Sequence, residues 1–404
     1  MKKALKEAIC ALLCVSFVLS IASCANIGDE DSDPGAETRS NLPISVGVND
    51  PYKPTGADTS TTPGGTGDTP SDPGSDPTAD PKSTDDSGAG NDTRSGDDTR
   101  SGNDTPSVID YDPDTSSEDV NVDYSKAVLQ YTRVTPAVDR SMITSTSHDT
   151  LETHGDFSGS EDALSDLENL LDNFDGDITL IAYSLDGSRS LCYNTGTVYQ
   201  PQCTYKAAFI FSICQYMDAV GFDDSTEFTL LEKNRMAGSG TVQRSPAGTK
   251  FTVHDLVTLC LSISDNSAFS LLHDHFGGGL RNEYMSQIGA NSLRTSYLYG
   301  SNIPCGDFII LWNEIYNYFL SGTYYSKLMK NACTGTTFAY ARPVNGLTYS
   351  HKSGDGFDLK ERHDVELVWD SQPYILAIYS RANVADGSSP TIENAAKIVH
   401  ERLY

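Results

Sequence analysis

The amino-acid sequence predicts a domain of the α/β class, of the α+β type, with an antiparallel sheet flanked by helices and an all-helical subdomain. Between about residues 160 and 404, segments with apolar residues at helical spacing alternate with short runs of β-branched and aromatic residues. Their order is a helix, two strands, a helical block, three strands and a closing helix, which indicates one sheet flanked by helices. About 250 patterned residues are enough for one substantial core.

The first elements of this domain follow from local patterns. Residues 162–174 place leucines on one helical face and predict an amphipathic helix. Residues 178–185 and 190–193 predict two strands, joined by turn residues at 186–188. Residues 207–220 are apolar nearly all round, which predicts a buried central helix.

The later elements are predicted in the same way. Thr252 and Asp255 have the spacing of a capping box and mark the start of a helix. A further helix is expected to end at Gly277. The remaining elements are an apolar helix-like stretch, three strands and a closing helix, at residues 308–319, 347–352, 365–369, 374–379 and 392–403.

Residues 1–24 have the pattern of an export signal, with three lysines ahead of an apolar run that is short for a membrane span. Small residues precede Cys24 and match a lipobox, which predicts cleavage before Cys24 and lipidation of its sulfur. An ordinary cleaved signal is the alternative. We therefore expect an extracytoplasmic protein that is anchored to the bacterial membrane through lipid.

Residues 25–125 are rich in Asp, Ser, Thr, Gly and Pro, so they are expected to form a disordered acidic tether. Acidic residues outnumber basic ones by 23 to 5 there, which accounts for most of the net charge of −28. Such a tether spans roughly 50 to 60 Å and lifts a domain clear of the lipid. Residues 126–159 form a lead-in without a defined pattern. The acidic balance argues against nucleic acid as a partner.

Three short motifs occur in an order that indicates chemistry. They are Cys203-Thr-Tyr-Lys206, Ser264-Asp-Asn266 and Lys352-Ser-Gly354. Cys203 heads the buried helix, where unpaired N–H groups and the helix dipole favour a thiolate or a developing oxyanion. Lys206 lies one turn further on the same face. Because the chain contains no Ser-x-x-Lys, Cys203 is the sole candidate for the nucleophile.

The motifs resemble those of the class A β-lactamase and penicillin-binding-protein superfamily, with cysteine in the position of the usual serine. The resemblance covers about residues 160–404, and the 61 residues from Cys203 to Ser264 are close to the family's spacing. It implies a β-lactamase- or transpeptidase-like fold. It also implies acyl transfer on β-lactams or D-alanyl cell-wall peptides.

The resemblance assigns a role to each motif residue. Cys203 attacks the substrate carbonyl, Lys206 takes or relays its proton, and Ser264 passes a proton to the leaving nitrogen. The implied substrate-binding residues are Asn266, Lys352, Ser353, Gly354, Asp355 and Arg362. Within this set the backbone N–H groups of Cys203 and Asp355 form the oxyanion hole. No cofactor or metal is implied, and we expect a monomer.

Two departures from the family pattern weaken the inference that the chain is an efficient hydrolase. Sulfur is larger than oxygen, so a site shaped around serine misplaces its attack. Class A enzymes also use a loop Glu to activate water, but residues 284–313 contain no Glu. Glu314 falls inside the apolar stretch 308–319, which Asp307 is expected to cap. A covalent adduct at Cys203 is therefore expected to hydrolyse slowly.

Other interpretations stay open at this point. If Cys203 is a silenced or structural residue, the domain is a non-catalytic module. Such a module would bind cell-wall peptide or a protein partner through the cleft in which related enzymes bind their substrate. The lysines at 206 and 352 can also be solvated charges, and Ser264-Asp-Asn266 can be only a helix cap.

The remaining histidines and cysteines point to structure. His273 and His275 diverge on a helix, so surface histidines are favoured over a metal site. The exported domain carries six cysteines, which permits disulfides. We hypothesise a link between Cys214 and Cys260 on neighbouring helices. The other cysteines have no readable partner.

Overall fold

The computed structural model describes residues 120–294, 301–334, 336, 339–342 and 346–404. The predictions for the export signal, for Cys24 and for nearly all of the acidic tether lie outside these residues. Within the described ranges, no helix has both the length and the apolar character that a bilayer crossing requires.

The described residues form a six-stranded antiparallel sheet in the order β1-β3-β2-β10-β9-β8. The strands are β1 (Glu152–His154), β2 (Gly176–Ser184), β3 (Ser190–Tyr193), β8 (Thr348–Asp355), β9 (Glu361–Trp369) and β10 (Tyr374–Ala382). At the centre, β2 from the start of the domain pairs with β10 from its end. This confirms the predicted antiparallel sheet and places β8 at an edge.

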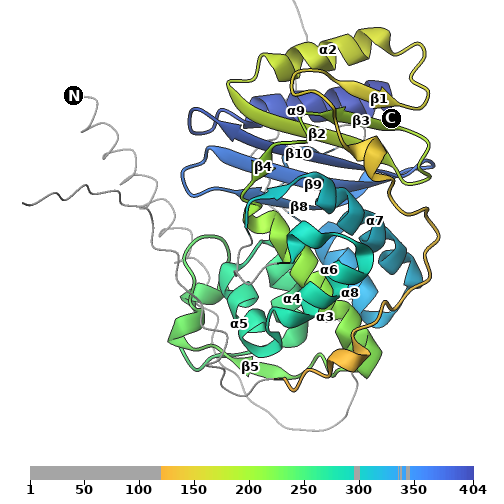
Figure 1. The fold of residues 1–404 in the computed structure, drawn as a ribbon. Coiled ribbons are helices and arrows are strands. Elements are labelled where there is room, and N and C mark those ends of the chain that lie inside the picture. Colours follow the sequence, from red (N-terminus) through yellow and green to blue (C-terminus); the bar gives the residue numbers. More distant parts are fainter. Residues whose placement is uncertain (1–119, 295–300, 335, 337–338, 343–345) are drawn as a thin grey trace, which may run out of the picture. The chain divides into compact units, whose positions relative to one another are not determined.

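Helices cover both faces of the sheet (Figure 1). One face packs against α2 (Glu161–Asp172), α9 (Ser389–Ile398) and the π-helical turn Val399–Leu403. The opposite face supports the helical subdomain, which comprises α3 (Lys206–Val220), α4 (Val253–Ser262), α5 (Asn266–Phe276), α6 (Gly279–Ile288), α7 (Gly306–Ser321) and α8 (Tyr324–Thr334). Short two-stranded ladders join β4 (Val198–Tyr199) to β7 (Ile303–Pro304) and β5 (Glu227–Thr229) to β6 (Lys250–Thr252). The predicted α+β class is confirmed.

The helix boundaries follow the sequence signals. Every residue of α3 up to Met217 is buried, as the uniformly apolar pattern predicts, and the helix ends at Gly221 with φ +63°. The Oγ1 atom of Thr252 accepts the backbone N–H of Asp255 at 3.1 Å and caps α4. Gly277 ends α5 as predicted. Neither α6 nor α8 is predicted as a separate element from the sequence.

The lead-in is ordered and packs along the helical subdomain. Val120 donates its N–H to the carbonyl of His275 at 3.1 Å, and Asp123 donates to the Tyr216 hydroxyl at 3.0 Å. Gln130 donates its N–H to the side chain of Gln215 at 2.8 Å. Residues 120 and 123, which the sequence assigns to the tether, thus contact α5 and α3. Side chains of the helices bind the polar backbone here, an arrangement that leaves no periodicity in the sequence.

The expectation of surface histidines is wrong. His273 and His275 are both buried in α5. The ring of His275 stacks on Phe228 of β5 at 3.7 Å between centroids. Burial, together with the nearby Arg281 charge, lowers the pKa of His273 to about 4. The lead-in and β5 cover a helix face that would otherwise meet solvent.

The hypothesised Cys214–Cys260 disulfide is also wrong, because all six cysteines of the described domain are free. Apart from Cys203, they are buried and pack as small apolar side chains. Burial raises the pKa of Cys260 to about 12, so its thiol stays protonated and unreactive.

Candidate active site

Cys203 lies in a 3₁₀ turn, Gln202–Tyr205, directly ahead of α3. The structure thus places it one turn before the helix and not at its first residue. Gln202 has the left-handed φ of +49°, and its side-chain amide donates to Glu361 of β9 at 2.5 Å. This bond ties the turn to the sheet. Cys203 is the one partly exposed thiol among the described cysteines.

Lys206 points back from the first residue of α3 toward the turn between α4 and α5. Its Nζ donates to the Ser264 carbonyl at 2.5 Å, to Oδ1 of Asn266 at 2.7 Å and to the Ser264 hydroxyl at 3.3 Å. Only 1% of Lys206 is exposed, so it is not a solvated charge. The Cys203 sulfur lies 3.9 Å from the same Asn266 oxygen.

The Ser264-Asp-Asn266 segment is held in a strained conformation. Ser264 has φ +57°, a value that is rare for a residue with a side chain. The carboxylate of Asp265 caps α5 and also accepts the backbone N–H groups of Thr241 and Val242, at 2.5 and 2.9 Å. Asn266 donates its amide to the Ala237 carbonyl at 2.8 Å. The motif is a helix cap, and it also anchors the 237–242 loop beside the cleft.

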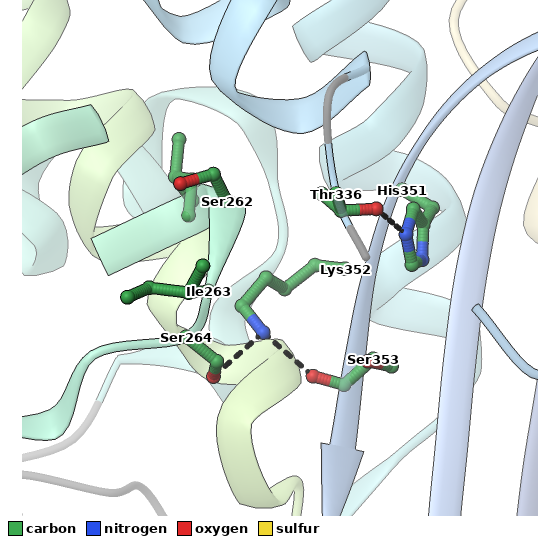
Figure 2. A pocket seen from close by; sticks show the side chains of 8 residues that line it. Ser262, Ile263, Ser264, Thr336, His351, Lys352 and Ser353 are labelled. Carbon is green, nitrogen blue, oxygen red and sulfur yellow. Dashed lines mark hydrogen bonds between the residues drawn. The ribbon is translucent and has the colours of Figure 1, made fainter. Parts of the chain in front are cut away.

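Lys352 reaches the same serine from β8 (Figure 2). Its Nζ donates to the Ser264 hydroxyl at 2.9 Å and to the Ser353 carbonyl at 2.7 Å. Lys352 is 2% exposed. The described part of the structure therefore brings Cys203, Lys206, Ser264, Asn266 and Lys352 together from four separate elements.

Gly354 lets β8 approach the nucleophile closely. A Cβ atom added there would lie 2.6 Å from the backbone nitrogen of Cys203 and 2.9 Å from that of Thr204. Real Cβ contacts are never this short, so the position requires glycine.

The two ammonium groups control the charge of the thiol. Burial opposes ionisation of Cys203, but the charges of Lys206 and Lys352 and a hydrogen bond to Ser264 outweigh it, so the pKa of Cys203 is lowered. Burial and the neighbouring Lys206 charge in turn lower the pKa of Lys352. The arrangement favours a thiolate beside ammonium groups, which is the reactive form of cysteine.

A small cavity adjoins Ser264 and Lys352. It is lined by Leu261, Ser262, Ile263, Ser264, Thr336, His351, Lys352 and Ser353 (Figure 2). Its volume of about 20 Å³ has room for about one water molecule. A β-lactam does not fit there, so a substrate would have to bind over the exposed side of Cys203.

Arg362 and the Asp355 side chain do not join the lysines. Arg362 pairs with Asp355 across β8 and β9, on the sheet face opposite to Lys352. The Arg362 guanidinium donates to Asp386 and Ser389. The Asp355 carboxylate accepts the Tyr340 hydroxyl at 2.6 Å. The predicted roles of Arg362 and of the Asp355 N–H stay predictions.

Neither acidic residue of the α7 region reaches the cleft. Glu314 is buried and binds the Arg133 guanidinium at 2.8 Å and the Tyr131 hydroxyl at 2.6 Å. Asp307 does not cap α7, because its carboxylate accepts Arg140 at 2.8 Å and Ser292 at 2.6 Å. Both carboxylates fasten other chain segments to the helix.

The structure adds residues that the sequence analysis did not single out. Gln202 fixes the nucleophile turn, and Asp265 fixes the 237–242 loop. The Asp265 role has a sequence signal, because an aspartate directly before a helix is a common cap. The Gln202 contact with β9 spans 159 residues and leaves no local signal.

The family of this chain follows from its sequence match over the folded domain. Residues 162–403 match the model of the β-lactamase enzyme family, so the chain belongs to that family. No curated protein matches it. The class of protein that the fold and site define is therefore the serine β-lactamase superfamily, with cysteine as the candidate nucleophile.

Solved structures share the fold at low sequence identity. PBP-A is 19% identical with a TM-score of 0.54, and the match covers 62% of this chain and 98% of PBP-A. The TLA-1 extended-spectrum β-lactamase is 16% identical with a TM-score of 0.54, covering 61% and 99%. A β-lactamase from Sphaerobacter thermophilus is 17% identical with a TM-score of 0.52, covering 60% and 96%.

We expect the Cys203 thiol to titrate below the value of about 8.5 for ordinary cysteine. Lys352→Met removes one of the two charges that favour the thiolate, so the pKa of Cys203 should rise by about one unit or more. The pH dependence of iodoacetamide alkylation, followed by intact mass, measures this. Lys360→Met alters an exposed lysine of the same hairpin and should leave the profile unchanged. Superimposable profiles for all three proteins would contradict the electrostatic account.

We expect Gly354→Ala to destabilise the protein by about 1–3 kcal/mol, because the added methyl overlaps the backbone of the nucleophile turn. The displaced strand should carry Lys352 away and raise the pKa of Cys203. Urea unfolding and alkylation profiles check both effects. In Gly196→Ala the new methyl would meet its nearest neighbour at 3.6 Å, so little change is expected. Equal stability of the two variants would argue against close strand contact.

Proposed function

We propose that this chain is a lipid-anchored β-lactamase-like acyl-transfer domain that acts on β-lactams or D-alanyl cell-wall peptides through a thioester at Cys203. The observation that supports this most directly is the arrangement of Lys206 and Lys352 around the Ser264 hydroxyl, beside the sulfur. Two buried cations are costly to maintain, and they are useful where a thiolate and a substrate carboxylate bind.

The proposed reaction follows from the hydrogen bonds. The Cys203 thiolate attacks the substrate carbonyl carbon, and collapse of the intermediate forms the thioester and breaks the carbon–nitrogen bond. The Ser264 hydroxyl gives its proton to the leaving nitrogen. Lys352, at 2.9 Å, or Lys206, at 3.3 Å, returns a proton to Ser264. Counted from a neutral thiol and a neutral lysine, the thiol proton passes to that lysine as the thiolate forms and then, through Ser264, to the leaving nitrogen, so the lysine ends neutral as it began.

Family membership and one structural relative support the substrate class. The chain belongs to the β-lactamase enzyme family over residues 162–403. A PBP-A variant, 19% identical with a TM-score of 0.52, has been captured as an acyl-enzyme complex with penicillin G. We extend this covalent chemistry to Cys203 because the motif lysines converge beside its sulfur.

Slow deacylation is part of the proposal. The stretch from 284 to 313 contains no Glu, and Glu314 is engaged with Arg133 and Tyr131. A general base for the hydrolytic water is therefore missing at the position where class A enzymes have it. The acyl group is expected to remain on sulfur for a long time.

The setting of the domain is also proposed. Lipidation at Cys24 would hold the chain at the outer face of a bacterial membrane. The acidic segment would then act as a spacer, and the domain would act as a monomer on substrates of the cell envelope.

Incubation with benzylpenicillin should give a one-to-one covalent adduct. The mass should rise by the whole mass of the drug, because ring opening leaves the departing nitrogen attached to the acyl group. Intact-mass spectrometry measures this, and Cys203→Ala should abolish the adduct. Cys192→Ala, which alters a buried thiol of β3, is the matched control and should retain it.

An unchanged mass for the native chain would contradict the proposed covalent adduct. Calorimetry with the same drug and with a D-alanyl-D-alanine peptide would then separate a binding module from an inert domain. An adduct that survives Cys203→Ala would point to a different nucleophile.

Hydrolysis of a chromogenic cephalosporin should be slow in the native chain, at least about 100-fold below the roughly 10 s⁻¹ of a median enzyme. The physical reason is the missing general base. A burst of one equivalent followed by a slow steady state is the expected time course. Turnover at the ordinary enzyme rate would show that another group activates water. Cys203→Ser tests how much the sulfur itself contributes.

A further inference from the structure

A second cluster of polar side chains lies on the other face of the sheet from Lys352. His351 of β8 is directly opposite Glu366 of β9, and Asp364 is two residues before Glu366 on the same face. All three residues are at most 1% exposed. One nitrogen or oxygen atom from each lies within 4.8 Å of the other two.

Glu366 is the unusual member of this cluster. Within the described residues, neither of its carboxylate oxygens has a hydrogen-bond partner, although the residue is completely buried. The His400 Nε2 atom lies 3.4 Å from Oε2, but burial keeps that ring neutral by lowering its pKa to about 4, and its Nε2 already contacts the Ala341 carbonyl at 2.7 Å. A buried carboxylate without hydrogen bonds is costly, and such groups normally bind a cation or take up a proton.

The other two residues, His351 and Asp364, are held in place by hydrogen bonds. Nδ1 of His351 lies 2.8 Å from Oδ1 of Asp364, and its Nε2 contacts the Thr336 hydroxyl. The second Asp364 oxygen accepts the N–H groups of Tyr340 and Ala341, at 2.6 and 3.2 Å. The contacts from Thr336, Tyr340 and Ala341 come from outside the cluster and hold the ring and the carboxylate in place, as the groups behind metal ligands do. The His351–Asp364 bond instead joins two members of the cluster.

We propose that His351, Asp364 and Glu366 form a structural site for one divalent transition-metal ion, with Zn²⁺ as the expected occupant. One imidazole and two carboxylates suit Zn²⁺ better than the all-oxygen ligation of Ca²⁺ or Mg²⁺. Zn–N and Zn–O bonds are about 2.0–2.2 Å, so neighbouring ligand atoms on a tetrahedral ion lie about 3.4 Å apart. The widest separation in the cluster, at most 4.8 Å, would contract by up to about 1.4 Å, and the 2.8 Å separation of His351 and Asp364 would widen as the ion replaces the proton between them.

The position of the site gives it a structural consequence. The groups behind the ligands, Thr336, Tyr340 and Ala341, belong to the segment that connects α8 to β8. Thr336 also lines the small cavity next to Ser264 and Lys352. A bound ion would fasten this segment to the sheet and would steady one wall of the active site. The proposal does not depend on the chemistry at Cys203.

Protonation of Glu366 is the competing outcome. Burial and the Asp364 charge raise its pKa well above the ordinary value, so a neutral carboxylic acid accounts for the cluster if no metal binds. The two outcomes differ in metal content, which is directly measurable.

The test uses the tag-free Cys203→Ala protein, which removes the exposed thiol as a competing zinc ligand. After incubation with Zn²⁺ and removal of the excess, mass spectrometry of the elements should find about one zinc per chain. Zn²⁺ at about 100 times its dissociation constant should raise the midpoint of thermal unfolding by roughly 5 °C, and EDTA should reverse the rise. Mn²⁺ and Ca²⁺ serve as comparison ions.

Glu366→Gln should lose the zinc and the thermal shift, because it keeps the shape of the side chain and removes the charge. Glu361→Gln makes the same change on the opposite face of β9 and should retain both. His351→Gln serves as a second variant if Glu366→Gln does not fold. The proposal is overturned if the Cys203→Ala protein, with no further change, takes up no stoichiometric zinc. Undiminished binding in both Glu366→Gln and His351→Gln overturns it as well.

Discussion

Two buried ammonium groups that share one serine hydroxyl are the constraint on which the active site depends. The hydrogen-bond partners of Lys206 and Lys352 within the described residues are neutral oxygens, from Ser264, Asn266 and Ser353. Neutral oxygens solvate a cation but do not balance its charge. The pair therefore favours an anion nearby, and the Cys203 sulfur is the ionisable group at that position. The strained Ser264 turn, the Asp265 anchor and the glycine at 354 all serve to hold these charges in place.

This constraint also explains why cysteine is compatible with a site that usually holds serine. A serine hydroxyl needs a strong base in the attacking step, whereas a thiol next to cations is already partly ionised. The same lysine that would accept a proton from serine can stabilise a thiolate as an ammonium ion. Attack on a carbonyl is thus supported by the geometry, while activation of water is a separate requirement. Glu314 does not meet that requirement, since it fixes the lead-in through Arg133 and Tyr131.

The sequence was informative where the cause of structure is local. The apolar α3, the Thr252 cap and the three motifs each depend on a few consecutive residues. The fold and the family predicted from them are confirmed. It was uninformative where distant segments meet. The buried position of His275 depends on chain segments about 50 and 150 residues earlier, and the order of the lead-in depends on bonds to three helices. A disulfide between two helices likewise requires a particular distance and orientation of the two cysteines, which their spacing in the sequence does not determine.

The edge strand β8 couples the two unusual features of this domain. Because side chains alternate along a strand, Lys352 faces the nucleophile while His351 and Ser353 face the buried acidic pair. The Ser353 carbonyl accepts a hydrogen bond from Lys352 at 2.7 Å. A small rotation of β8 would therefore move this partner of the Lys352 ammonium group together with His351 of the buried cluster. Among the described residues β8 has no strand beyond it, so such a rotation is less restrained there than at the centre of the sheet.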